Sequence, residues 1–348
     1  MMLRPLLILV TVVAGASRLA HGQGMSCLGD TLTIRADRGL TSSVHPVAPG
    51  VTYQCLLDRR GPWAMHLVRV QLSGPVTVDA MRATGRFVGR ERVSDMAQRW
   101  RARRASPLIG LNADFFNLQT GEVTSTHVEG GQWIKGITRP DTNAPPVDDA
   151  RSQVAVLTDG RVRFGRFELH GEVRAGARRL PLDGLNAYPP GTLRGAVVVT
   201  AAYGDELAAD SAARPRGSRF VLARLTPAAG VPRYRVVARA DTDRPTPIPR
   251  DGAVLVVGPA HAAFRPGEIL AIQVALGTER LQAHAVVGGW GRLLADGRDV
   301  AAALDRVEGT RPDFSAARHP RTAVGTSADG RTLLLLVVDG RRRWSVGM

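Results

Sequence analysis

The chain has 348 residues and a formal net charge of +15, and its length suffices for one large domain or two ordinary ones. A positive charge of this size suggests nucleic acid or an anionic membrane as a binding partner. The arginines are scattered along the chain, however, and aromatic residues make up only 5% of it, so a groove that stacks bases is not indicated. We expect no nucleic-acid partner, and a basic surface suited to acidic or phosphate-bearing polymers.

Residues 1–22 predict a secretory signal peptide. Arg4 precedes an apolar run over residues 6–14, and small residues follow at Ala20 and Gly22. The run is shorter than the roughly 20 residues of a membrane-spanning helix, although an uncleaved anchor is the alternative. We therefore expect a secreted or periplasmic protein without an integral membrane segment after cleavage.

Two cysteines, Cys27 and Cys55, lie near the start of the exported chain. In an oxidising compartment they are compatible with one disulfide, and two buried thiols are the alternative. Their spacing does not indicate a zinc site. The sequence predicts no cofactor and leaves the question of a metal open.

One helix is predicted early in the chain. Asp95 is its expected N-cap, Gln98 follows three residues later, and Ser106 and Pro107 close it after Arg104. An apolar run over residues 108–111 is expected to form a strand directly after this helix.

The rest of the chain is rich in Asp-Gly turns beside short apolar runs, such as residues 154–157, 254–257 and 333–338. This pattern is typical of strands joined as hairpins. The predicted fold class is α+β, with a mixed, mainly antiparallel sheet and a few flanking helices. We expect an N-terminal segment over residues 23–50 and one domain over residues 51–348.

Several common enzyme classes have no motif here. The chain contains no G-x-S-x-G elbow, no H-E-x-x-H pair and no G-x-x-x-x-G-K loop. Serine-hydrolase, zincin and P-loop chemistry therefore have no support.

The C-terminal hairpin carries the most informative polar residues. If residues 319–325 and 332–338 pair about the turn at 327–330, Asp339 falls opposite the level of Arg318 and His319. His319, Arg321 and Asp339 would then converge at one end of the sheet, where a base, a cation and a carboxylate suit phosphate binding and acid/base work. An Asp-Gly turn with a surface ion pair is the alternative.

Two further segments could reach the same site. Asn112 and Asp114 follow the predicted strand at residues 108–111, and strand ends commonly host ligands. Gly288 and Gly289 would let a backbone approach a ligand closely, and a β-bulge is the alternative, which the segment by itself favours.

In this order, between Gly50 and Met348, these segments resemble the phosphodiester glycosidases. This family is related to N-acetylglucosamine-1-phosphodiester α-N-acetylglucosaminidase, and its bacterial members are linked to exopolysaccharide. The resemblance rests on Asn-Ala-Asp-Phe-Phe at 112–116, the glycine pair at 288–289, residues 319–325, and residues 338–340 leading to Ser-Val-Gly-Met at 345–348.

The resemblance implies a hydrolase with a mixed α/β domain that cleaves a sugar 1-phosphodiester at the anomeric carbon. It implies that Arg321 binds phosphate, that Asp339 positions water or stabilises the sugar cation, and that His319 moves a proton. Asn112 and Asp114 would orient sugar hydroxyls, and Gly288 and Gly289 would line the substrate site.

In this family an Asp-Gly-Gly-Gly-Ser stretch follows the segment that corresponds to residues 345–348. Because the sequence ends at Met348, the C-terminal part of the domain is expected to be incomplete. A non-catalytic binding protein for phosphorylated or acidic polysaccharide is the alternative function.

Overall fold

The computed structural model describes residues 24–28, 30–33, 39–101, 107–138, 152–189, 192–210, 217–225, 230–261, 264–310 and 312–348. The predicted signal peptide, residues 1–22, lies outside these residues. The protein is mostly β, with 46% strand and 8% helix, so the α+β prediction with flanking helices is wrong. The reason is that strands in the middle of the chain close into a barrel, which buries the apolar faces of these strands without covering helices.

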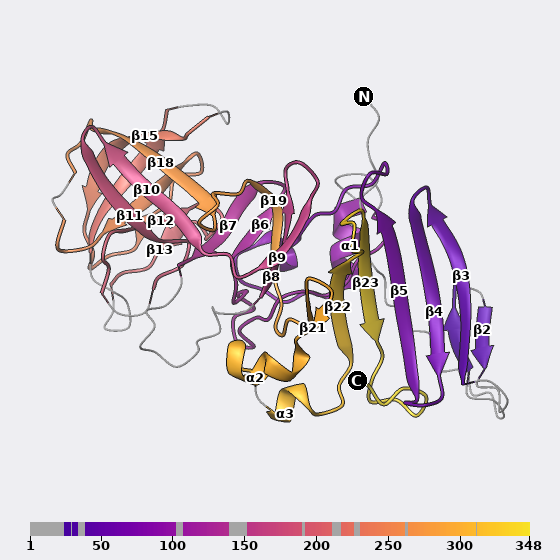
Figure 1. Ribbon diagram of the computed structural model, residues 1–348. Helices are drawn as coiled ribbons and strands as arrows, with labels where there is room; N and C mark the ends of the chain where they lie inside the picture. Colours follow the sequence, from indigo (N-terminus) through magenta and orange to yellow (C-terminus); the bar gives the residue numbers. More distant parts are fainter. Residues whose placement is uncertain are drawn as a thin grey trace.

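A five-stranded antiparallel sheet joins the beginning and the end of the chain, in the order β22-β23-β5-β4-β3. Figure 1 shows the yellow C-terminal hairpin beside the indigo strands. A small ladder of β1 and β2 lies nearby, and a disulfide joins Cys27 of β1 to Cys55 of β4. The strands are β1 Gly24–Cys27, β2 Asp30–Thr33, β3 Leu40–Ala48, β4 Val51–Asp58, β5 Trp63–Gln71, β22 Arg321–Thr326 and β23 Thr332–Val338.

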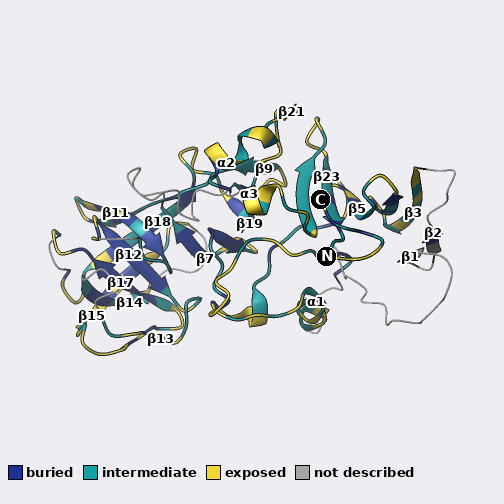
Figure 2. Cartoon of the chain, turned by 90° about the horizontal axis from the view of Figure 1, so that it is seen from below, coloured by how far each residue is buried: buried dark blue, intermediate teal, exposed yellow. Residues whose placement is uncertain are grey.

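A closed barrel of seven strands occupies the middle of the chain, in the order β10-β18-β15-β14-β17-β12-β11, with β11 pairing back to β10. Its strands form the largely buried part of Figure 2. Phe220, Leu255 and Leu270 are fully buried inside. The strands are β10 Leu169–Ala175, β11 Arg178–Leu185, β12 Ala196–Thr200, β14 Ser218–Arg224, β15 Arg233–Ala240, β17 Gly252–Val257 and β18 Ile269–Leu276.

Five central strands continue from the barrel through β11 in the order β7-β6-β19-β8-β9. They are β6 His127–Glu129, β7 Gln132–Ile137, β8 Gln153–Leu157, β9 Val162–Gly165 and β19 Ala283–Gly288. The short ladders are β13 Glu206–Leu207 with β16 Thr246–Pro247, and β20 Leu294–Ala295 with β21 Arg298–Asp299. The glycine pair lies at the end of β19, one of the central strands, which Figure 1 shows between the barrel and the five-stranded sheet.

The helices are short. They are α1 Val93–Arg101, α2 Leu304–Val307 and α3 Pro312–Ser315, with the 3-10 turns η1 Ala83–Gly85 and η3 Ala301–Ala303. The predicted helix exists, but it begins before Asp95, which lies in its first turn and not at the N-cap; residues 102–106 lie outside the described part. None of the helices in the described ranges is long and apolar enough to cross a membrane.

The strand predicted at residues 108–111 does not form. Ile109 is instead buried in the core against the five-stranded sheet, with Leu108 and Leu111 packed beside it. The apolar run is therefore explained by side-chain packing and not by backbone pairing. The predicted runs 154–157, 254–257 and 333–338 do lie in β8, β17 and β23, and Asp-Gly turns join β8 to β9, β20 to β21 and β22 to β23.

Candidate active site

The three chemically interesting segments meet through hydrogen bonds. The backbone N–H of Asp114 donates to the carbonyl of Gly288 at 2.9 Å, which joins the segment after α1 to the end of β19. The hydroxyl of Thr322 in β22 donates to Oδ1 of Asn112 at 2.7 Å. Asn112 therefore lies at the end of the sheet where β22 begins, which is also the end that carries His319.

An aromatic cluster of Phe115, Trp290 and Phe314 fills the space between these segments. The rings of Phe115 and Trp290 meet edge to face with centroids 5.5 Å apart, and those of Trp290 and Phe314 stack at 5.0 Å. The Phe314 ring, carried by α3, also stacks on His319 at 6.5 Å. Such pairs stabilise their neighbours beyond simple burial, so the cluster fixes the three segments relative to one another.

Arg321 lies against the same cluster. Its guanidinium carbon is 4.8 Å from the centroid of the Phe314 ring, which is a cation–π distance. Its Nη2 donates to the carbonyls of Phe314 at 2.6 Å and Ala317 at 2.8 Å, and its Nε donates to that of Met348 at 2.8 Å. Burial lowers the pKa of Arg321. Among the described residues Nη1 makes no hydrogen bond, so it is the nitrogen best placed to meet a ligand.

Asp114 adopts a left-handed backbone conformation with φ of 57°, which Asp tolerates better than most residues. Its Oδ1 accepts hydrogen bonds from the Phe115 N–H at 2.6 Å and from the Ser125 hydroxyl at 3.0 Å. Its Oδ2 is buried and has no hydrogen-bond partner among the described residues. A hydroxyl group of a ligand would satisfy that oxygen.

Gly288 and Gly289 differ in what surrounds them. A Cβ on Gly288 would lie 2.4 Å from Oδ1 of Asp114 and 2.2 Å from the Ser125 hydroxyl oxygen, so only glycine fits. Gly289 donates its N–H to the carbonyl of Ser152 at 2.9 Å and has room for a side chain. Gly288 is therefore needed because the Asp114 side chain packs against its backbone. The group that approaches it closely belongs to the protein and not to a ligand.

The loop after Gly289 is held by the buried carboxylate of Glu308. Four donors surround it at 2.7 to 3.1 Å: the hydroxyl and N–H of Ser152 and the N–H groups of Gly291 and Arg292. Burial raises the pKa of Glu308, but these hydrogen bonds outweigh it and hold the pKa below its usual value. The Glu308 carbonyl also accepts from the Trp290 ring N–H at 2.9 Å. Glu308 therefore positions Trp290 within the aromatic cluster.

Asp339 lies apart from Arg321. The hairpin forms, but Arg321 pairs with Val338, so Asp339 falls opposite Pro320, which is nearer the turn than the expected level of Arg318 and His319. Side chains alternate between the faces of a strand, and the Asp339 carboxylate faces His66 of β5 at 3.7 Å. In the described part of the chain it makes no ion pair with Arg321, and His319 instead contacts Arg341, with Nδ1 3.1 Å from Nη2.

The structure thus brings Asn112, Asp114 and Gly288 together, and places His319 and Arg321 on the aromatic cluster. Phe314, Glu308 and His66 were not predicted, because each is an isolated residue whose partners are distant in the chain. Within the described ranges, no group of three or more His, Cys, Asp or Glu residues is arranged to hold a metal ion.

Comparison with known proteins bears on the second half of this site. Residues 230–348 match the phosphodiester glycosidase family. This match confirms, for the last third of the chain, the resemblance found in the sequence. It spans Gly288, Gly289, His319, Arg321 and Asp339, whereas Asn112 and Asp114 precede it.

Two solved structures have a similar fold. A hypothetical protein from Synechocystis has a TM-score of 0.65 and 20% identity, over 91% of this chain and 55% of its own. A protein from Burkholderia pseudomallei has a TM-score of 0.55 and 21% identity, over 83% of this chain and 64% of its own. The chain therefore spans less than two thirds of either structure's length. A search of curated proteins found no significant match.

Proposed function

We propose that the protein is an exported glycosidase that hydrolyses a sugar 1-phosphodiester at the anomeric carbon, on envelope or exopolysaccharide-type substrates. One observation carries the proposal: the three distant segments that hold Asn112 and Asp114, Gly288, and His319 and Arg321 meet through hydrogen bonds and one aromatic cluster. The part of the site within residues 230–348 matches a family of this activity.

The chemistry fits the groups present. Phosphate is a good leaving group, so catalysis depends on stabilising its charge and the oxocarbenium-like sugar. Nη1 of Arg321 would contact the phosphate, with the other two nitrogens fixed by backbone carbonyls. The buried Oδ2 of Asp114 would accept a hydrogen bond from a sugar hydroxyl, and the side-chain amide of Asn112 would donate one. His319 would move a proton. The resemblance assigns Asp339 to the sugar side of the scissile bond, where it would stabilise the sugar cation or orient water, although its carboxylate faces His66 and not Arg321.

Product analysis tests this function. The purified chain, and a longer chain that includes the Asp-Gly-Gly-Gly-Ser segment implied by the resemblance, are incubated with N-acetylglucosamine 1-phosphodiesters. We expect free sugar and a phosphomonoester on the aglycone. Sugar 1-phosphate among the products would instead assign a phosphodiesterase. Tight binding without turnover by either chain would establish the polysaccharide-binding alternative.

A further inference from the structure

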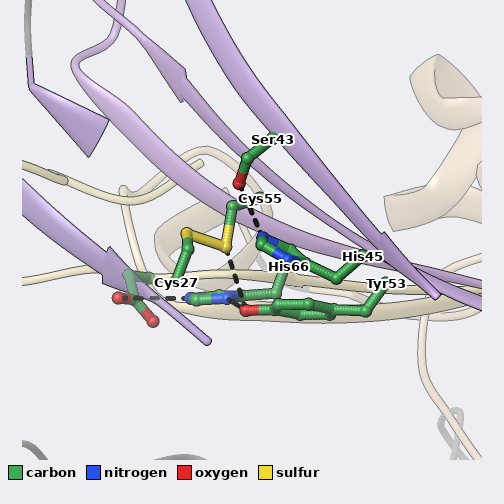
Figure 3. The surroundings of a disulfide bond; sticks show 7 residues. Cys27, Ser43, His45, Tyr53, Cys55 and His66 are labelled. Atoms are coloured by element: carbon green, nitrogen blue, oxygen red, sulfur yellow. Dashed lines mark hydrogen bonds and ion pairs between the residues drawn. A yellow bond between two sulfur atoms is a disulfide. The ribbon is translucent and has the colours of Figure 1, made fainter. Parts of the chain in front are cut away.

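The inner face of the five-stranded sheet carries a row of polar side chains that leads to Asp339. The hydroxyl of Tyr53 in β4 is 2.6 Å from Nδ1 of His66 in β5, and Nε2 of His66 is 3.7 Å from Oδ2 of Asp339. Figure 3 shows the Tyr53 hydroxyl directed at the imidazole of His66, next to the disulfide. His66 is mostly buried, with 16% of its side chain exposed, whereas 34% of the Asp339 side chain is exposed.

The environment of Tyr53 fixes which atom carries the proton. Burial, with a smaller effect from the charge of Asp339, raises the pKa of Tyr53 to about 12, so its hydroxyl stays protonated at neutral pH. Its other neighbour, Sγ of Cys55 at 3.1 Å, is part of a disulfide and has no hydrogen to donate. Sulfur is also a weak acceptor, whereas an imidazole nitrogen is a strong one and lies closer, at 2.6 Å. We therefore assign the short contact with His66 as a hydrogen bond in which Tyr53 donates and Nδ1 accepts.

A neutral imidazole that accepts at Nδ1 carries its proton at Nε2. In His66 that N–H faces the Asp339 carboxylate. The backbone of Asp339 is fixed independently, since its N–H donates to the carbonyl of Ala64 at 2.9 Å and its carbonyl accepts from the Ser345 hydroxyl at 2.5 Å. The remaining freedom of Asp339 is rotation of its carboxylate, and His66 is the group that faces it.

Resting on the proposed function, we propose that His66 is a positioning residue that orients the Asp339 carboxylate for the developing sugar cation, and that Tyr53 fixes its tautomer. Groups that orient a reacting carboxylate contribute through preorganisation, which a static ion pair on the surface does not. Their loss lowers the rate of the chemical step more than substrate affinity.

The same sheet offers a matched control. His45 in β3 lies beside Tyr53, with ring centroids 6.3 Å apart, and its Nε2 is 3.0 Å from the Ser43 hydroxyl. Figure 3 shows the two histidines on either side of Tyr53, and their strands, β3 and β5, both pair with β4. The imidazole that faces Asp339 is that of His66, so His45→Gln removes an imidazole from this sheet and leaves His66 in place.

The test compares kcat and KM of His66→Leu, His66→Gln, Tyr53→Phe and His45→Gln in the chain that turns over the phosphodiester. We expect His66→Leu to lower kcat about 100-fold with little change in KM. His66→Gln keeps an N–H donor, so its kcat should lie between those of His66→Leu and the wild type. Tyr53→Phe should lower kcat about tenfold and, by ¹⁵N NMR, convert His66 from one tautomer to a mixture. His45→Gln should change neither.

Equal kcat in His66→Leu and His45→Gln, with thermal unfolding midpoints that show both variants folded, would overturn the inference. So would an unchanged His66 tautomer in Tyr53→Phe. These outcomes leave the proposed function intact, because the wild-type chain remains active. A wild-type chain without turnover would remove the proposed function, and this inference with it.

Discussion

The N–H of Asp114 donates a 2.9 Å hydrogen bond to the carbonyl of Gly288, and a Cβ on that glycine would lie 2.4 Å from the Asp114 carboxylate. Gly288→Ala should therefore displace Asp114 and lower the free energy of unfolding by about 1 to 3 kcal/mol. Chemical denaturation checks this value. Gly289→Ala is the control, because its Cβ would meet nothing closer than 3.5 Å, and an equal loss in both variants would contradict the close-approach explanation.

Glu308 provides a prediction about pH. The pKa of Glu308 is lowered in the folded protein. The carboxylate therefore stabilises the fold at pH values above its unfolded-state pKa of about 4.3, and this stabilisation is lost as the pH falls through the folded-state pKa. We expect the stability difference between wild type and Glu308→Gln to be largest near neutral pH and to shrink below about pH 4. Urea titrations at several pH values measure it. Glu279→Gln, at an exposed ion pair with Arg163, should show almost no difference.

The adjacent phenylalanines should differ in stability. Phe115 contacts Trp290 and Phe314, whereas Phe116 is 46% exposed. Because Phe115 is only half-buried, Phe115→Ala should cost about 2 kcal/mol, below the usual range for a fully buried ring. Phe116→Ala should cost less than about 1 kcal/mol. Thermal unfolding of the two variants distinguishes them, and equal costs would show that the aromatic cluster does not stabilise this region.

Arg321→Lys should lower kcat by roughly one to three orders of magnitude. Lysine keeps the charge, but its single ammonium group cannot both donate to the carbonyls of Phe314, Ala317 and Met348 and contact the phosphate. Steady-state kinetics on the phosphodiester measures the loss. Arg318→Lys is the matched control, since Arg318 is exposed and donates to the Gly61 carbonyl; a similar loss there would mean that the effect is one of general charge.

The sequence predicted local features better than global ones. Asp-Gly turns and apolar runs located β8, β17 and β23, because the period of a strand and the chemistry of a turn are local properties. Closure of the barrel depends on the pairing of β10 with β11 and of β10 with β18, about a hundred residues away, and no local pattern encodes that distance. The same limit explains the strand wrongly predicted at residues 108–111, where an apolar run packs without pairing.

The candidate site follows the same rule. Asn112, Asp114 and His319 were found because they lie in recognisable segments, but the aromatic cluster depends on Phe314, a single residue in a four-residue helix. Arg321 pairs with Val338, the last residue of β23. Side chains alternate between the two faces of a sheet, so the next residue, Asp339, faces His66 and not Arg321.

The position of bond cleavage tests the central claim most directly. Hydrolysis of a sugar 1-phosphodiester in ¹⁸O-labelled water, followed by ³¹P NMR of the released phosphomonoester, shows whether oxygen from water enters the phosphate. Attack at the anomeric carbon predicts a phosphomonoester without ¹⁸O, because the bond between carbon and oxygen breaks. A phosphomonoester that carries ¹⁸O would show attack at phosphorus and would contradict the assignment of a glycosidase.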